Sequence, residues 1–188
     1  MKFIIDTSSW VALVRYYHPF DNGSVIYDFF KEKVVRKDFI LLDEVVRECS
    51  FVAKKIVIDK LDFIKVKENQ IKTNELLPNR KFYNLLENQF CNQFQKRRLN
   101  EAEFEAETNS FIKSADAKII LQALKWQREG LFDEPIIVSE ESESANDHKL
   151  FKKIPVMCKS VDIECITLPQ LFNKFKDEIQ IGLKIAKQ

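Results

Sequence analysis

The chain has 188 residues, 45% of them hydrophobic, which suits a single globular domain with a sizeable core. Its 30 basic and 29 acidic side chains leave a net charge of +1, which excludes a protein that coats nucleic acid by overall charge alone. Three glycines are too few for a glycine-rich phosphate loop, and four scattered cysteines without a C-x-x-C pair argue against a zinc site of the usual spacing.

The N-terminus begins with a short apolar run, Phe3-Ile4-Ile5, which is typical of a buried strand and ends at Asp6. A helix is predicted next, with Ser8 or Ser9 as its cap. The apolar run is too short for a signal peptide or a membrane span, and no later stretch is long enough to span. We therefore expect a cytoplasmic protein with no membrane contact.

The following segments are predicted to be mainly helical. A second helix presents Val25, Ile26, Phe29 and Phe30 on one face. Residues 39–42 are expected to be an apolar lead-in to a third helix, which runs from about residue 43 to 55. Residues 62–67 alternate like a half-buried strand, and 74–80 resemble a loop.

A long polar helical region is predicted over residues 81–108, with a break near Asn100. Together with the residues from 57 onward it is expected to form a helical insertion or lid on the core. We do not expect a separate domain, so residues 1–188 are predicted to form one unit. Phe82, Phe90 and Phe94 are expected in the core rather than on a partner surface.

The C-terminal half alternates helix and strand. Ser114 can cap a helix from 115 to about 126, and 136–138 form a buried strand. A helix at 154–160, a strand at 163–166 and a helix capped by Thr167 follow, with Pro169 in its first turn. This alternation predicts a three-layer α/β/α fold with a central, mostly parallel sheet. The polar loop around His148 is expected to be solvated.

Acidic and hydroxyl residues follow two of these strands. Asp6 and Ser8 come directly after the first strand, and Ser139, Glu140 and Glu141 come after the strand at 136–138. In open parallel sheets ligands bind beyond the carboxyl ends of the strands, so these groups are expected to converge if the strands are neighbours.

Two helices can add carboxylates to that edge. Asp116 lies near the middle of an apolar helical stripe, where a carboxylate is costly unless it is paired or bound to metal. Glu44 and Glu48 share a face of the third helix, and Glu48 lies closer to its apolar stripe. Each acid also has a simpler explanation: Asp116 suits the first turn of any helix, Asp6 can serve only as a cap, and the glutamates can be solvated.

Such a group of oxygen ligands suits a hard divalent cation such as Mg²⁺ or Mn²⁺. Hydrolysis of a phosphodiester needs an activated water and neutralisation of developing charge, and one or two such ions supply both. Without a cation, neighbouring carboxylates would repel one another and some would take up protons.

Four segments, taken in order, resemble the signatures of PIN-domain nucleases, which include the VapC toxins. They are FIIDTSSW, LLDEVVREC, SADAKIILQA and IIVSEES. The first resembles the opening strand and turn of that family, the next two its acid-bearing helices, and the last its strand followed by a hydroxyl and an acid.

This resemblance implies a metal-dependent ribonuclease that cleaves single-stranded RNA by metal-activated water and leaves a 5′-phosphate. It also implies frequent homodimers and, for the toxin branch, a cognate antitoxin. The metal-site acids would be Asp6, Glu48, Asp116 and Glu141, and the accessory hydroxyls would be Ser8 and Ser139.

The chain departs from the family pattern in three respects. The fourth acid is usually Asp, whereas here it is Glu141 with Glu140 and Glu143 as rivals, and Glu44 competes with Glu48. The middle region is also longer than in compact toxins, which suggests a larger branch of the family. An inactive PIN-like module that binds RNA or a protein therefore stays open as the alternative.

Two other enzyme classes fit the sequence less well. A phosphatase of the haloacid-dehalogenase type needs a second Asp where this chain has Ser8, and a serine hydrolase needs a G-x-S-x-G turn that is absent from the sequence. Three basic runs remain as candidates for a local RNA groove, although most such runs are solvated helix surface. They are 31–37, 96–98 and 152–153.

Overall fold

Five parallel strands form the central sheet of the computed structural model, in the order β3-β2-β1-β4-β5. Phe3 of β1 lies opposite Phe39 of β2, and Ile5 lies opposite Val138 of β4 on the other side. Because the strands run the same way, their carboxyl ends meet at one edge. The structure describes residues 1–21, 23–130, 134–143 and 149–179. The strands are β1 (Phe3–Ile5), β2 (Phe39–Leu42), β3 (Gln70–Ile71), β4 (Ile136–Val138) and β5 (Cys165–Ile166).

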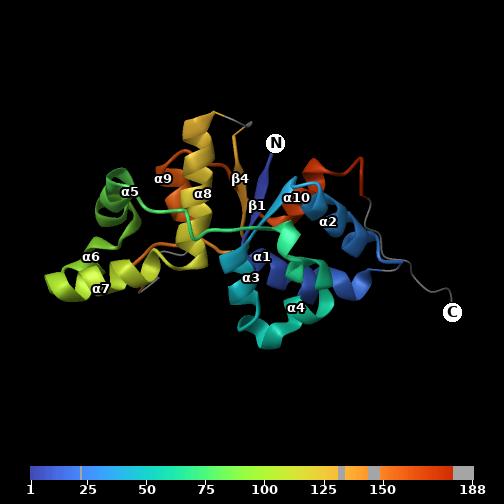
Figure 1. Ribbon diagram of the computed structural model, residues 1–188, viewed down its shortest axis with the longest axis horizontal. Helices are drawn as coiled ribbons and strands as arrows, with labels where there is room; N and C mark the ends of the chain where they lie inside the picture. Colours follow the sequence, from blue (N-terminus) through green and yellow to red (C-terminus); the bar gives the residue numbers. More distant parts are fainter. Residues whose placement is uncertain (22, 131–133, 144–148, 180–188) are drawn as a thin grey trace.

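Helices cover both faces of the sheet (Figure 1). Helices α2 (Val25–Val35) and α10 (Leu168–Lys174) lie on one face, and α8 (Ala115–Glu129) and α9 (Ile154–Ser160) lie on the other. The predicted three-layer α/β/α fold is therefore confirmed, with a sheet that is parallel throughout the described residues. None of the helices in these residues is long and apolar enough to cross a membrane.

Aromatic rings fill the layer between the sheet and α2 with α10. The ring of Phe39 lies 5.7 Å from Phe3, 5.2 Å from Phe30 and 5.5 Å from Phe175, measured between centroids. Edge-on and tilted contacts of this kind contribute beyond the area that the rings bury. The run at 39–42 thus packs as a strand that is buried on both faces.

The first helix is capped by Asp6 rather than by Ser8 or Ser9. The Asp6 carboxylate accepts from the backbone N–H of Ser8, at 3.4 Å. The helix then widens into a π-helical turn, a feature that is rare and often found at functional sites. These elements are α1 (Thr7–Ala12), the π-helical η1 (Leu13–Tyr17) and the 3₁₀ turn η2 (His18–Phe20).

Three predictions for residues 39–71 are wrong. Residues 39–42 form a strand of the sheet, β2, and are not merely a lead-in to the helix that follows, and that helix, α3 (Asp43–Cys49), ends six residues before residue 55. Residues 62–65 form a 3₁₀ turn, because the adjacent Phe63 and Ile64 are both buried and a half-buried strand buries only alternate residues. The remaining elements here are η3 (Val52–Lys55), α4 (Ile56–Lys60), η4 (Asp62–Lys65) and η5 (Lys67–Asn69).

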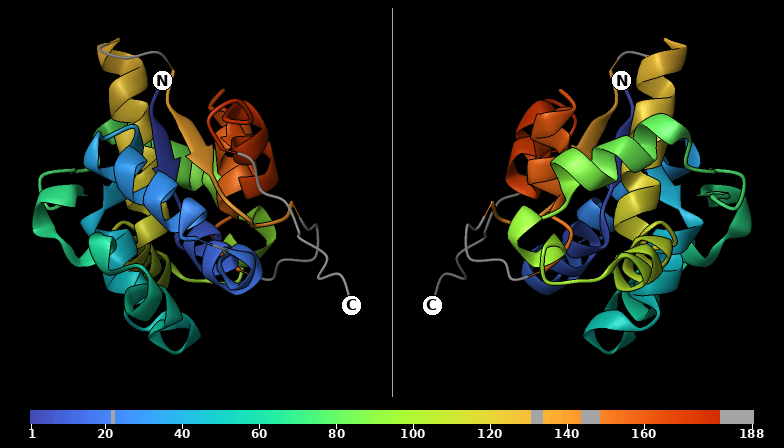
Figure 2. Two further views of the ribbon diagram at one scale, coloured as in Figure 1. Left: turned by 90° about the vertical axis from the view of Figure 1, so that its right-hand side faces the viewer. Right: turned by 90° about the vertical axis from the view of Figure 1, so that its left-hand side faces the viewer.

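The predicted insertion at 57–108 divides into two parts. Its first part belongs to the core, since residues 70–71 add β3 to the sheet beside β2. The second part forms a helical layer outside α8 and α9, which we call the outer arm (residues 80–111; Figures 1 and 2). Asn100 breaks this arm, as predicted, and forms a capping box with Glu103. The arm contains α5 (Arg80–Leu85), the π-helical η6 (Leu86–Phe90), α6 (Gln93–Lys96) and α7 (Glu101–Phe111).

Other details follow the predictions more closely. Ser114 caps α8 by accepting from the N–H of Ala117, and Thr167 caps α10 with a proline in its first turn. Phe82 and Phe90 are buried as expected, whereas Phe94 is 68% exposed, so its assignment to the core is wrong. The loop around His148 lies outside the described residues.

Candidate active site

A pocket of about 540 Å³ opens at the carboxyl edge of the sheet, and four acids from distant segments line it. Asp6 follows β1, Glu48 lies on α3, Asp116 lies in the first turn of α8, and Glu141 follows β4. These are the four acids that the sequence patterns select. Glu140 lines the pocket as well.

Asp6 lies deepest and is only 3% exposed. The Ser8 hydroxyl donates to its Oδ2 at 2.5 Å, and the Ser139 hydroxyl donates to the same oxygen at 2.9 Å. Burial raises the pKa of Asp6 to about 6, while the two hydroxyls act in the opposite direction. Both serines therefore orient the Asp6 carboxylate and favour its charged form.

Asp116 is the most perturbed acid of the pocket. Burial, followed by the charges of Asp6, Glu141 and Glu48, raises its pKa to about 8, and only Lys149 acts against them. Within the described part of the chain, no hydrogen bond stabilises the charged form of Asp116. Its carboxylate therefore lacks the compensation that a buried charge normally has.

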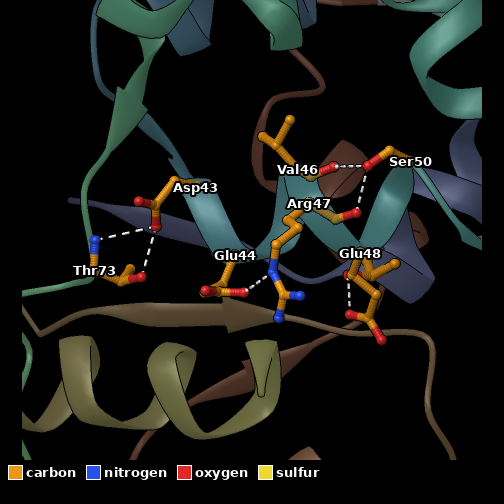
Figure 3. Close-up of polar contacts among 8 residues, drawn as sticks. Asp43, Glu44, Val46, Arg47, Glu48, Ser50 and Thr73 are labelled. Carbon is orange, nitrogen blue, oxygen red and sulfur yellow. Dashed lines mark hydrogen bonds and ion pairs between the residues drawn. The ribbon is translucent and has the colours of Figure 1, made fainter. Parts of the chain in front are cut away.

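The two glutamates of α3 have different surroundings (Figure 3). Glu48 lines the pocket and accepts a hydrogen bond from the Thr7 hydroxyl at 2.6 Å. Glu44 is paired with Arg47, 2.5 Å from its Nε, and is not among the residues that line the pocket. Of the two rivals, Glu48 is the one beside Asp6 and Asp116.

The three glutamates after β4 also separate. Glu141 accepts from the backbone N–H of Ile154 at 3.0 Å, and its charge acts on both Asp6 and Asp116. Glu140 lines the pocket but accepts from the N–H of Leu168 at 2.5 Å. The third, Glu143, is exposed, and its Oε2 lies 3.8 Å from the Nζ of Lys159. Glu141 therefore has the strongest coupling to the other acids.

Comparison with known families gives one match. The sequence model of a domain of unknown function, DUF4411, matches residues 3–179. The chain belongs to the DUF4411 family. The match spans the sheet and all four acids of the pocket, so these features lie within the family domain. No curated protein and no solved structure matches this DUF4411 chain.

Several polar residues of the pocket were not selected from the sequence. Thr7 donates a hydrogen bond to Glu48. Because Thr7 directly follows Asp6, the sequence already indicated that it lies near the site. Arg15 and Tyr16 of the π-helical η1 line the pocket together with Ser8 and Ala12, and this spacing of three to four residues was an available signal. Lys149 also lines the pocket, although the basic runs considered from the sequence lie elsewhere in the chain.

The residues of this DUF4411 pocket fit a hard divalent cation by their chemistry. Carboxylate oxygens are the ligands that Mg²⁺ and Mn²⁺ prefer, and a cation would offset the mutual repulsion that acts on Asp116. In the described ranges, however, no three His, Cys, Asp or Glu side chains form a ready metal-binding group. Glu48 and Glu141 are instead turned toward donors of their own chain.

Proposed function

We propose that this DUF4411 protein is a metal-dependent endoribonuclease that hydrolyses phosphodiester bonds of single-stranded RNA. One observation carries the proposal: four carboxylates from four separate segments line a single pocket at the carboxyl edge of a parallel sheet. The acids proposed to hold Mg²⁺ or Mn²⁺ are Asp6, Glu48, Asp116 and Glu141.

The energetic state of the pocket supports a bound cation. The raised pKa values of Asp6, about 6, and Asp116, about 8, record how unfavourable two ionised carboxylates are there. Folding tolerates such a group at a functional site when the function needs it. A stable core alone gives no reason to gather these acids at one edge.

Each residue of the pocket has a definite part in the proposed reaction. A bound divalent cation supplies an activated water and charge neutralisation at the phosphate. Ser8 and Ser139 hold the Asp6 carboxylate in one orientation, and Thr7 holds that of Glu48. Arg15 and Lys149 supply positive charge beside the acids, where it attracts the backbone of a nucleic acid.

The resemblance to PIN-domain nucleases supports the same reaction and suggests the biological setting. By this resemblance the protein acts in the cytoplasm, forms homodimers and, if it belongs to the toxin branch, is held inactive by a cognate antitoxin.

A second candidate function is a PIN-like module that binds RNA or a protein without cleaving it. The observation in its favour is that Glu48 and Glu141 accept hydrogen bonds from their own chain rather than forming a metal-binding group with Asp116. Calorimetric titration with Mn²⁺ separates the candidates, because the enzyme needs the cation and the binding module does not.

The direct test is cleavage of a mixed single-stranded RNA pool with Mn²⁺ and with a chelator, followed by identification of the new ends. We expect Mn²⁺-dependent cleavage that leaves 5′-phosphates and is abolished by Asp6→Asn and by Asp116→Asn. The matched control is Asp28→Asn, which changes an exposed acid in the first turn of α2. Cleavage that survives either pocket substitution, in a folded protein, would overturn the proposal.

A further inference from the structure

The short helix α6 and the turn after it present an exposed aromatic ring beside two exposed arginines. Phe94 is 68% exposed, and the guanidinium carbon of Arg98 lies 5.8 Å from the centre of its ring. Arg97 is exposed as well. Lys96 has other contacts, since its ammonium lies 4.5 Å from the centre of the Phe104 ring. We call residues 94–98 the aromatic turn.

A single exposed ring is common on protein surfaces, so the informative feature here is the combination of the Phe94 ring with two exposed arginines. Proteins that bind unpaired nucleic acid combine such rings, on which bases stack, with cations that contact the phosphates. Phe94 with Arg97 and Arg98 has both components. The guanidinium of Arg98 lies over the Phe94 ring and fixes a positive charge next to it.

A short basic segment, residues 149–153, connects the aromatic turn to the acidic pocket. Both ends of this segment lie at the pocket. Lys149 lines it, and Ile154, the residue after the segment, donates its N–H to Glu141. In its middle, the segment pairs with the residues just before the turn. The pairing consists of an antiparallel bridge between Cys91 and Phe151, the bond from Asn92 N to Leu150 O at 2.7 Å, and the bond from Lys152 N to Phe90 O at 2.8 Å.

The outer arm therefore has a fixed position relative to the pocket (Figures 1 and 2). The ring of Phe151 stacks on that of Phe111 at 4.2 Å between centroids, which fastens the same segment to the end of α7. Helix α7 itself carries exposed acids that repel phosphate, so a nucleic acid is not expected to follow it. These acids are Glu101, Glu103, Glu105 and Glu107.

We propose that single-stranded RNA extends from the acidic pocket along residues 149–153 and places an unpaired base on Phe94, with Arg97 and Arg98 at its phosphates. This inference rests on the proposed function for the identity of the ligand. It adds a second contact region, remote from the reacting phosphodiester, that selects unpaired strands of sufficient length.

The test measures binding without cleavage, by fluorescence anisotropy of labelled RNA in the presence of a chelator. A single strand of about 20 nucleotides can span pocket and turn, whereas one of about four nucleotides occupies only one of them. We expect Phe94→Ala to weaken binding of the long strand about tenfold or more, with Phe94→Tyr close to wild type. The long strand should also bind more tightly than a duplex of the same sequence.

Two further variants complete the test. In a plot of the logarithm of the binding constant against the logarithm of salt concentration, Arg98→Gln should make the slope shallower by about 0.7. This is the contribution of one phosphate contact to the binding of a single strand. Phe20→Ala is the matched control, because Phe20 is also an exposed aromatic residue, 53% exposed, and belongs to neither the outer arm nor the residues that line the pocket. It should bind both strands like the wild type.

The outcomes separate this inference from the proposed function. Unchanged binding of the long strand by Phe94→Ala, an equal loss with Phe20→Ala, or no RNA binding by the wild type would each overturn the inference, whatever the cleavage assay shows. A Phe94-dependent preference for long single strands supports it even if Mn²⁺ produces no cleavage, and in that case only the nuclease proposal falls.

Discussion

Replacing Asp116 by Asn should stabilise the metal-free protein, and the gain should grow with pH. The pKa of Asp116 is raised to about 8 in the folded chain, against an ordinary value of 3.8. Because the folded chain disfavours ionised Asp116, the neutral acid contributes fully to stability below about pH 4. This contribution is lost as pH rises toward 8 and Asp116 ionises. Asn keeps the shape of the neutral acid and does not ionise, so the loss of stability that is due to Asp116 should be absent from the variant.

The size of the effect follows from the two pKa values. A tenfold change in an ionisation constant corresponds to about 1.4 kcal/mol, so the difference between 3.8 and about 8 sets an upper bound of about 6 kcal/mol. The pocket is open and Asp116 is only partly covered, so solvent relaxation reduces this figure. We expect the variant to exceed the wild type by about 2 kcal/mol near pH 8 and to equal it near pH 4.5.

Urea unfolding in a chelator, followed by tryptophan fluorescence at several pH values, measures this difference. Asp28→Asn provides the baseline, since its difference from the wild type should be small and independent of pH. Added Mn²⁺ should then stabilise the wild type more than Asp116→Asn, because a ligand of the folded state stabilises in proportion to its affinity. A difference that stays constant with pH, or a wild type that gains stability on the alkaline side, would refute the reasoning.

Three further predictions concern the surroundings of the pocket. Glu48→Gln should weaken Mn²⁺ binding, measured by calorimetry, by more than about tenfold, whereas Glu44→Gln on the same helix should leave it unchanged. Ser139→Ala removes a hydrogen bond that lowers the pKa of Asp6, so that pKa should rise above about 6 and the midpoint of Mn²⁺ binding should move to higher pH. Lys54 has a φ of 55° in the left-handed region, so Lys54→Gly should raise the free energy of unfolding by about 1 kcal/mol in urea titrations, and an unchanged or lower value would contradict the prediction.

The sequence predicted the fold class because the central strands are continuous apolar runs that end in polar residues. β1 and β4 are of this kind, and the caps at Ser114 and Thr167 locate the helices. The strand β2 was not recognised, because a run of four apolar residues that passes directly into a helix has no distinguishing period. β3 contains only two residues, both half-buried, and therefore has no apolar run to detect.

The acids of the pocket could be chosen from the sequence because each lies at a strand end or beside an apolar stripe. Two choices depend on neighbours such as Arg47 and Leu168, which only the folded chain brings into contact. One is which of Glu44 and Glu48 lines the pocket, and the other is which of Glu140 and Glu141 acts on the other acids. Arg15 follows Ser8 and Ala12 at helical spacing, so its place in the pocket could be predicted once Ser8 had been assigned there.

The order of the strands has a consequence for biosynthesis. Asp6 is synthesised well before Ser139, which orients it and follows 133 positions later. β1 likewise waits for β4 before its second edge is paired. Contacts so distant along the chain form late, so a nascent chain carries no assembled pocket until most of it has been translated. Under the nuclease proposal, an unfinished chain would therefore not yet be able to cleave RNA.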